Sequence, residues 1–224
     1  MTRQLAFAVA LVALIASSAH AGPVYNAGSD FAVANPNGAW SYGWSTALTA
    51  SLNLYTAHDN LSGLDRLFSN GIDPNVSHKR FGAPSDPYGF PWPIGELSFH
   101  PGPAGEYSHI RWTAPDAGYY TIDARFSAPL NYLTTTDVHV LLANSSIFDG
   151  GININGAGPS ASFLTTVWVP AGAAVDFAVG YGTGSYFCDT TFLSAEIRAV
   201  PEPASLLMVG SGLVGLARWR KRRG

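Results

Sequence analysis

The sequence predicts an all-β protein, a jelly-roll-like two-sheet β-sandwich, and three observations support this fold class. From Gly22 onward, short runs of β-branched and aromatic residues alternate with Gly, Pro, Ser, Thr and Asn. No long stretch shows the 3.6-residue apolar period of an amphipathic helix. In the second half, the apolar runs follow one another at nearly even spacing. Only the two ends depart from this pattern, and there we expect an N-terminal signal helix and a short C-terminal hydrophobic helix.

Residues 1–21 have the pattern of a signal peptide. Arg3 precedes an apolar run from Leu5 to Ala16, and the small-residue sequence Ala19-His20-Ala21 follows it. The alternative, a first membrane span, requires more apolar length than this run supplies. We therefore expect export of the chain and a mature protein that begins at Gly22.

Residues 22–199 have a length that suits one domain, which we interpret as the β-sandwich. This part of the chain holds six Lys and Arg against 14 Asp and Glu, which gives a net charge of −8. An acidic domain is a poor partner for nucleic acid, and we expect none. Cys188 is the only cysteine, so an intramolecular disulfide is excluded, and we expect its thiol to be half hidden at a strand end.

The first half of the domain contains three predicted strands. They are residues 31–34, Trp40–Ser45 after the turn Asn35-Pro-Asn-Gly38, and residues 48–55. Two-residue alternation places Trp40, Tyr42 and Trp44 on one face of the second strand.

Proline and glycine are frequent between about residues 56 and 105. Because proline cannot donate to a β-ladder, we predict long loops there, with one short edge strand near Leu64–Phe68.

The second half contains six predicted strands separated by turn-forming residues. These are residues 106–113, 119–126, 136–142, 162–169, 174–179 and 191–199.

The span from His100 to Ile197 resembles the carbohydrate-binding-module-like jelly-roll domains of bacterial surface proteins and polysaccharide-active enzymes. The resemblance lies in strand and turn sequences such as Glu106-Tyr-Ser-His-Ile-Arg-Trp-Thr-Ala-Pro115 and Thr136-Asp-Val-His-Val-Leu-Leu142. It implies the fold rather than a ligand. The sequence departs from the pattern after Leu142, where Ala-Asn-Ser-Ser replaces the Asn-Gly dipeptide expected at a hairpin.

Asp137 and His139 are the first candidate binding residues. They lie two apart in a predicted strand whose alternate residues, Val138 and Val140, are apolar, so both side chains point away from the core. Such a pair can bind a sugar hydroxyl or assist acid-base chemistry. The alternative is an ordinary polar face of an antiparallel sheet.

Aromatic residues supply the other candidates. Sugar rings stack on flat aromatic surfaces, and Trp92, Tyr186 and Trp44 are the rings that we select for this role. Core packing is the alternative for Trp44. Further aromatics in turn-rich or strand-edge settings are Trp40, Tyr42, Tyr88 and Tyr181.

The sequence shows no catalytic motif, so we predict a protein that is not an enzyme. The histidines lack paired metal-ligand spacing, and we expect no cofactor or catalytic metal. Calcium is the one cation that we consider, because Asp149, Asp176 and Asp189 lie at turns or strand ends.

The last 25 residues have three parts: Pro201-Glu202-Pro203, an apolar run from residue 204 to 217, and a basic end. Fourteen helical residues cover roughly 21 Å of a hydrocarbon core of about 30 Å, so the membrane segment that we expect at residues 204–219 is short. The alternative is a buried C-terminal core helix. The cations at the end are Arg218, Arg220, Lys221, Arg222 and Arg223.

This tail resembles the PEP-CTERM sorting signal. The resemblance implies that an exosortase-type membrane transpeptidase recognises residues 200–224 and removes them. It further implies transient anchoring in the inner membrane, followed by delivery to the cell surface, the outer membrane or the extracellular matrix. Its sorting residues are Pro201, Glu202, Pro203, Arg218, Arg220, Arg222 and Arg223.

Taken together, these features favour an exported surface or matrix protein whose β-sandwich binds polysaccharide. The first alternative is a structural or protein-interaction domain of the matrix without a glycan ligand. The second is an enzyme that acts on glycans.

Overall fold

The computed structural model describes residues 22–83, 85, 91–129, 133–153 and 158–201. Residues Pro23–Ala199 form one compact unit, the β-sandwich. Within the described residues, no helix has the length and apolar character needed to cross a membrane. The signal peptide and the hydrophobic tail segment that we predict lie outside the described residues.

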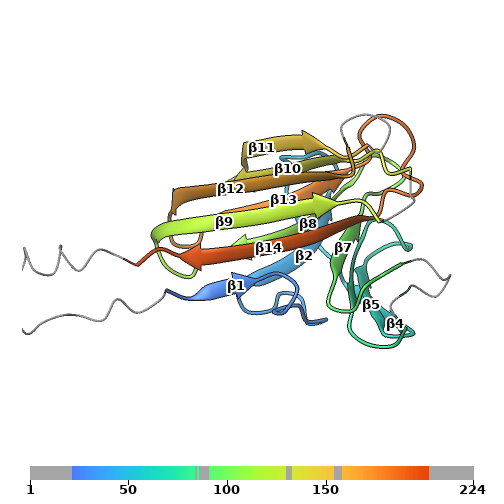
Figure 1. Ribbon diagram of the computed structural model, residues 1–224, viewed down its shortest axis with the longest axis horizontal. Coiled ribbons are helices and arrows are strands. Elements are labelled where there is room, and N and C mark those ends of the chain that lie inside the picture. The colour runs from blue at the N-terminus through green and yellow to red at the C-terminus, as the bar shows by residue number, and fades with distance from the viewer. Residues whose placement is uncertain (1–21, 84, 86–90, 130–132, 154–157, 202–224) are drawn as a thin grey trace, which may run out of the picture. The chain divides into compact units, whose positions relative to one another are not determined.

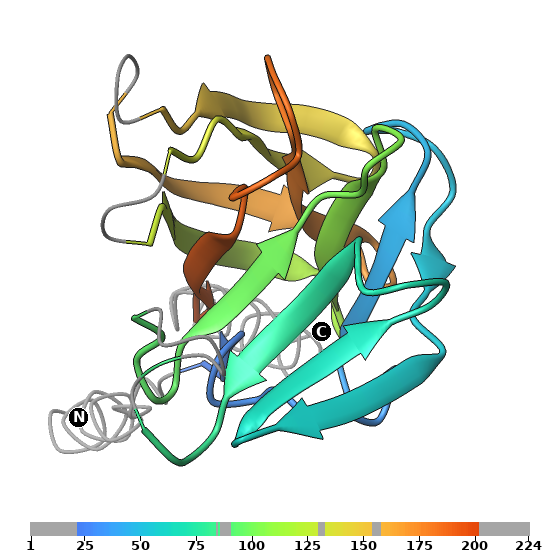
Figure 2. The same ribbon diagram turned by 90° about the vertical axis from the view of Figure 1, so that its right-hand side faces the viewer.

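The larger of the two sheets has eight strands among the described residues (Figures 1 and 2). Their spatial order is β12-β9-β14-β7-β6-β5-β4, and β1 also pairs with β14. Every ladder is antiparallel. The strands are β1 (Val24–Asn26), β4 (Ala57–Leu61), β5 (Leu64–Phe68), β6 (Asn75–Lys79), β7 (Leu97–His100), β9 (Gly118–Ser127), β12 (Ser160–Val169) and β14 (Thr191–Ala199).

The smaller sheet has six described strands in the order β11-β10-β13-β8-β2-β3, and it is also antiparallel. The prediction of an all-β, two-sheet sandwich is therefore confirmed. The strands are β2 (Trp40–Ser45), β3 (Asn53–Leu54), β8 (Tyr107–Thr113), β10 (Asp137–Leu142), β11 (Ser145–Gly151) and β13 (Ala174–Gly180).

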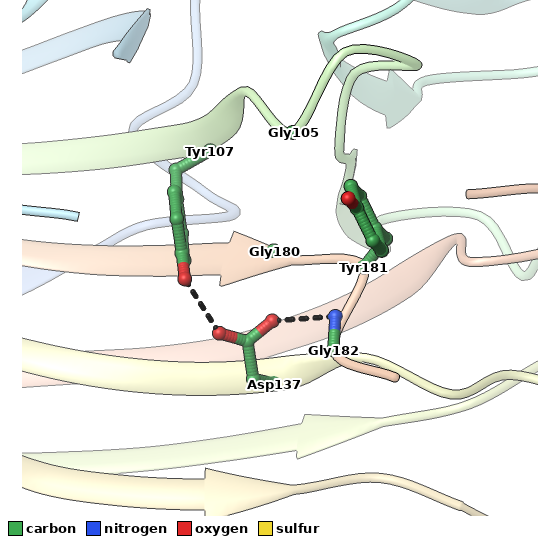
Figure 3. Close-up of a pocket in the computed structure, with 6 residues that line it drawn as sticks. All are labelled: Gly105, Tyr107, Asp137, Gly180, Tyr181 and Gly182. Atoms are coloured by element: carbon green, nitrogen blue, oxygen red, sulfur yellow. Dashed lines mark hydrogen bonds between the residues drawn. The ribbon is translucent and has the colours of Figure 1, made fainter. Parts of the chain in front are cut away.

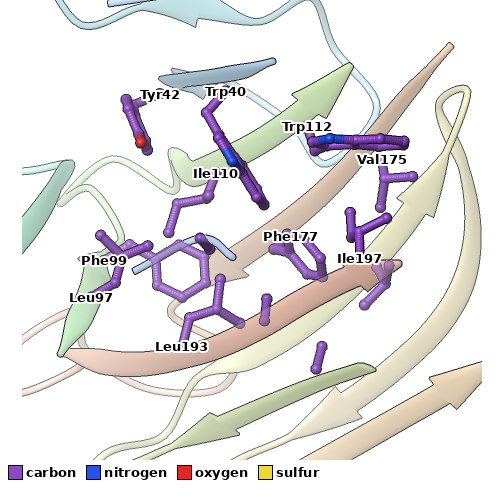
Figure 4. Close-up of a cluster of buried hydrophobic side chains, with 14 of the residues drawn as sticks. Trp40, Tyr42, Leu97, Phe99, Ile110, Trp112, Val175, Phe177, Leu193 and Ile197 are labelled. Carbon is purple, nitrogen blue, oxygen red and sulfur yellow. The ribbon is translucent and has the colours of Figure 1, made fainter. Parts of the chain in front are cut away.

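The core lies between the sheets and is rich in aromatic side chains (Figure 4). Trp40 and Tyr42 of β2 share one face, as the alternation predicts, and that face is the buried one; Trp112 packs edge-on against Tyr120. A fully buried side chain of this size stabilises the fold by about 1.5–3 kcal/mol. The rings therefore join the two sheets and hold their outer faces in place.

The first predicted strand, at residues 31–34, is wrong, because residues 31 and 32 have no regular structure and residues 33 and 34 lie in a bend. The Asp30 carboxylate accepts hydrogen bonds from the Asn26 backbone N–H and the Trp40 indole N–H, which turns the chain away from strand geometry. The strand that pairs with β14 is β1, a few residues earlier. Of the predicted strand at residues 48–55, only β3 is a strand.

The prediction of long loops between about residues 56 and 105 is also wrong, because this segment contains several strands. The predicted edge strand at Leu64–Phe68 is β5, but it is an internal strand: β4 and β6 pair with it, and β7 pairs with β6 on the far side. The prolines remain compatible with these strands because they lie beyond the strand ends. Pro74 immediately precedes β6 and Pro101 immediately follows β7.

Strand β11 is missing from the sequence prediction, which places turns at both of its ends. Its hairpin with β10 turns through Ala143 and Asn144, whose φ angles are 47° and 69°. Two residues of positive φ are what a type I′ hairpin turn requires. Ala-Asn thus takes the place of the absent Asn-Gly dipeptide.

Candidate functional site

Asp137 and His139 lie on the face of β10 that points away from the core, whereas Val138 and Val140 are buried inside. The two side chains contact each other, with His139 Nε2 2.8 Å from Asp137 Oδ2. His139 is nevertheless only 9% exposed. The structure therefore brings the predicted pair together in a covered position rather than on an open sheet face.

Asp149 of β11 completes this group from the neighbouring strand, since it pairs with His139 in the ladder. Its Oδ1 lies 2.6 Å from His139 Nδ1 and accepts a hydrogen bond from the Ser146 hydroxyl. His139 thus lies between two carboxylates and can donate to both when it is protonated.

Burial lowers the pKa of His139, but the hydrogen bonds to Asp137 and Asp149 outweigh burial and raise its pKa overall. The pKa of Asp149 is lowered by its hydrogen bonds from His139 and Ser146. For Asp137, burial opposes ionisation, yet hydrogen bonds from His139 and Tyr107 bring the net pKa below its usual value. Asp137 is therefore an ionised hydrogen-bond acceptor at neutral pH.

A pocket of about 180 Å³ opens beside Asp137, lined by Tyr107, Tyr181 and three glycines (Figure 3). Tyr107 donates its hydroxyl proton to Asp137 Oδ2 at 2.8 Å, and the Gly182 backbone N–H donates to Asp137 Oδ1 at 2.8 Å. Figure 3 shows the two tyrosine rings flanking the space next to the carboxylate. The pocket thus combines aromatic surface with a charged acceptor. The three glycines are Gly105, Gly180 and Gly182.

Two of these glycines are required by the geometry of the pocket. A Cβ atom at Gly180 would lie 2.5 Å from Asp137 Oδ1 and 2.6 Å from the Tyr107 ring. Gly182 has a φ of 59°, and a Cβ there would collide with the Thr135 carbonyl oxygen. Side chains at these positions would break the tyrosine–carboxylate contact.

A second polar group, Ser45, His109 and Asp176, lies on the same face of the smaller sheet. Ser45 Oγ is 2.7 Å from His109 Nε2, but Asp176 Oδ1 is 3.9 Å from His109 Nδ1 and forms a bidentate pair with Arg111. Burial lowers the pKa of His109 to about 4, and Ser45 donates its proton to the Ala47 carbonyl. All three side chains of this group are buried.

This serine, histidine and aspartate differ from a nucleophilic triad in two respects. The serine proton is already engaged by a backbone carbonyl, and the aspartate does not orient the imidazole. The arrangement fits a structural role, joining β2, β8 and β13. The sequence analysis missed it, because its members are far apart in the chain.

The other predicted ligand residues lie elsewhere. Trp44 is on the core side of β2 and packs against the core cluster, which fits the alternative that we considered for it. Trp92 packs edge-on against Phe192 of β14, and Tyr186 packs edge-on against His100 at the end of β7. These three rings do not line the pocket beside Asp137.

The structure adds Tyr107 and Tyr181 as pocket residues that the sequence analysis did not select. Tyr181 lies in the glycine-rich turn after β13, among the turn-region aromatics already noted. Tyr107 lies two residues before His109 in β8, so the sequence places both side chains on the same outward face. That spacing does not reveal that the partner of Tyr107 is Asp137, 30 residues away.

The three aspartates considered for calcium belong to separate interactions. Asp149 binds His139, Asp176 binds Arg111, and Asp189 accepts hydrogen bonds from Thr135. No group of three potential metal ligands occurs among the described residues. The expectation of no cofactor, with calcium as the one cation considered, stays a prediction.

The prediction for Cys188 is wrong. Its thiol is exposed, and the residue lies in a turn before β14 with a φ of 67°. The turn-forming residues that precede it, rather than its aromatic neighbours, decide its environment.

Comparison with protein families identifies the tail. Residues 199–223 match the family model of the PEP-CTERM protein-sorting motif. The chain therefore carries a PEP-CTERM sorting motif, as predicted, and this motif indicates an exported protein that is processed by an exosortase. Pro201 is exposed, whereas the other predicted sorting residues lie outside the described residues. No curated protein matches the chain.

Several solved carbohydrate-binding modules are similar in structure to the sandwich. One is CBM51 from Clostridium perfringens GH95 in complex with methyl-galactose, with 14% identity and a TM-score of 0.38, covering 79% of this chain and 100% of that one. Another is CBM35 from Paenibacillus barcinonensis, with 10% identity and a TM-score of 0.30, covering 81% and 100%.

A third structure holds CBM51-2 with GlcNAc and INT domains from Clostridium perfringens ZmpB. It has 14% identity and a TM-score of 0.37, and the match covers 46% of this chain and 22% of that one. Structural similarity at these identities and TM-scores does not identify a ligand for this chain.

Proposed function

We propose that this chain is an exported surface or matrix protein whose β-sandwich binds polysaccharide in the pocket beside Asp137. The sorting motif supports delivery outside the cell. The finer destination that we propose follows from the tail: transient anchoring in the inner membrane, cleavage by the exosortase, and release to the surface, outer membrane or matrix.

The observation that carries the ligand proposal is the composition of the pocket. Tyr107 and Tyr181 offer ring faces, while Asp137 is an ionised acceptor held in place by three hydrogen bonds. A carboxylate has about four lone-pair positions, so one remains for a hydroxyl of the ligand. Ring faces beside an oriented polar acceptor are the surface that a sugar ring recognises.

The domain is acidic, which favours neutral or hydroxyl-rich glycans over anionic ones. Because the pocket is small, at about 180 Å³, we propose binding of one or two sugar units at a time, and weak affinity per pocket.

Affinity electrophoresis of the exported protein in gels that contain neutral polysaccharides tests this proposal. Tyr181→Ala should reduce retardation roughly tenfold or more, because one of the two ring faces is removed. Tyr119→Ala is the matched control, since Tyr119 is an exposed tyrosine of β9 in the other sheet. Equal retardation of wild type and Tyr181→Ala on every polysaccharide that retards the protein would overturn the pocket assignment.

A further inference from the structure

Strand β12 forms one edge of the larger sheet and lacks the features that normally protect a sheet edge. It is ten residues long, pairs with β9 along its whole length, and pairs with no other described strand. Figure 1 shows it beyond β9 at this side of the sandwich. In an antiparallel ladder, alternate residues direct their N–H and C=O groups toward the free side. About half of the β12 backbone groups are therefore available to another strand.

The sequence of β12 is Ser-Ala-Ser-Phe-Leu-Thr-Thr-Val-Trp-Val, with no charged residue and no proline. Charges, proline and bulges are the usual means by which proteins prevent edge-to-edge pairing. The opposite edge of the same sheet has this protection, because β4 carries His58 and Asp59 and is half as long. The β4 edge is therefore protected against pairing with an added strand, whereas the β12 edge is not.

The outward side of β12 also carries two large apolar side chains. Leu164 is 69% exposed and Trp168 is 48% exposed, and the Trp168 ring packs edge-on against Tyr119 of β9. Large exposed apolar groups beside an open edge are typical of interaction sites. They would be covered in part by a strand added to β12.

We propose that β12 pairs antiparallel with β12 of a second copy of this chain, so that the two larger sheets become continuous. An uncharged strand can pair with itself without like-charge repulsion across the two-fold axis. Opposed residues of antiparallel strands share a face, so a two-fold register centred on Leu164 or Thr166 keeps every outward residue on the outer face. Leu164 then lies against itself or against Trp168 of the second copy.

We favour a second copy of this chain over an unrelated strand as the partner of β12. In either register, the outward side chains of Leu164, Thr166 and Trp168 lie opposite one another across the two-fold axis and pair favourably. This inference goes beyond polysaccharide binding and does not depend on it. The pocket lies on the smaller sheet, so a dimer through β12 leaves it open.

Sedimentation velocity of the exported protein over a range of concentrations tests the proposal. Wild type should form a dimer, and Leu164→Lys should weaken self-association roughly tenfold or more, since it places two lysines at the paired edges. The fold should be unaffected, because the Leu164 side chain is 69% exposed, more than any other large apolar side chain among the described residues.

Two matched variants separate edge pairing from other contacts. Tyr119→Lys adds a charge to the same outer face but on β9, so it should leave an edge-paired dimer intact, whereas a dimer formed by face-to-face packing would dissociate. Leu61→Lys adds a charge to the other edge, at β4, and should have no effect. Hydrogen exchange should show slower exchange of β12 amides as concentration rises.

A monomer at all concentrations would overturn the proposal. So would a dimer that Leu164→Lys leaves intact, or one that Tyr119→Lys dissociates equally. Retardation by polysaccharide should be the same for the exported Leu164→Lys monomer and for wild-type monomer at low concentration. A variant that no longer dimerises but is still retarded by polysaccharide would therefore separate the dimer proposal from the glycan proposal.

Discussion

At the scale of single residues, the central feature is an imidazole between two carboxylates on adjacent strands. His139 contacts Asp137 within its own strand and Asp149 across the β10–β11 ladder. Asp137 also accepts hydrogen bonds from Tyr107 and the Gly182 backbone, so this one carboxylate links His139 to the wall of the pocket. Burial of His139 makes these contacts stronger than they would be in water.

The first prediction concerns pH. The folded-state pKa of His139 is raised above the usual 6.5, so its stabilisation is fully present below about pH 6.5 and is lost as pH rises through the raised pKa. The pKa values of Asp137 and Asp149 are lowered from the usual 3.8, so their contribution is lost as pH falls through the lowered values. The group should therefore stabilise the fold most between about pH 4 and 6.5.

Urea unfolding of wild type and His139→Gln at a series of pH values measures this effect. The difference between the two proteins isolates His139 from His78 and His109, whose lowered pKa values act in the opposite direction by weakening the fold at acid pH. The difference should shrink above neutral pH. A difference that is constant from pH 5 to 9 would contradict the prediction.

At the scale of elements, strands β8 and β13 are joined by a charge pair as well as by their ladder. Arg111 Nε and Nη2 donate to the two oxygens of Asp176 at 2.7 and 2.9 Å. The Asp176 side chain is 1% exposed, and Arg111 is its charged partner, since the nearby His109 has a pKa lowered to about 4 by burial and is neutral near neutral pH. A buried carboxylate that loses its partner has no other cation to balance it.

The second prediction follows from this pair. Arg111→Ala should lower the free energy of unfolding by about 3 kcal/mol, because it leaves a buried charge uncompensated. Arg125→Ala, in the exposed part of β9, is the control and should cost less than about 0.5 kcal/mol. Urea denaturation near neutral pH measures both. Equal losses for the two variants would show that the Asp176 pair adds nothing beyond surface electrostatics.

At the scale of the whole molecule, the chain has an acidic folded domain and a basic tail. The residues between 22 and 199 carry a net charge of −8, whereas five of the 12 cations lie after residue 217. Removal of the tail would therefore leave an acidic protein outside the cell. Such a domain repels anionic membrane surfaces.

The last prediction concerns this processing. The protein recovered outside the cell should lack the basic end, so its intact mass should fall short of the chain that begins at Gly22 and ends at Gly224. Replacing Pro201, Glu202 and Pro203 by alanine should leave the full tail in place and keep the protein in the membrane fraction. Recovery of an exported wild-type protein that still ends in Arg222-Arg223-Gly224 would contradict it.

The fold class, the regular strands of the second half and the sorting tail could all be predicted from the sequence. Each of these depends on local pattern: alternation, turn residues, or an ordered series of proline, apolar run and cations. Even the outward placement of Asp137 and His139 followed from alternation in one strand.

The packing of the whole fold settled that β4, β6 and β7 are strands, because the residues of these segments form strands weakly on their own, and β6 and β7 each border a proline. It also decided which residues meet at the pocket. Tyr107 and Tyr181 reach Asp137 because β8, β13 and β10 are adjacent, and that order comes from core packing rather than from residues near Asp137 in the chain. Contacts between distant segments carry no local sequence signal, since their free energy arises only when the sheets close on the core.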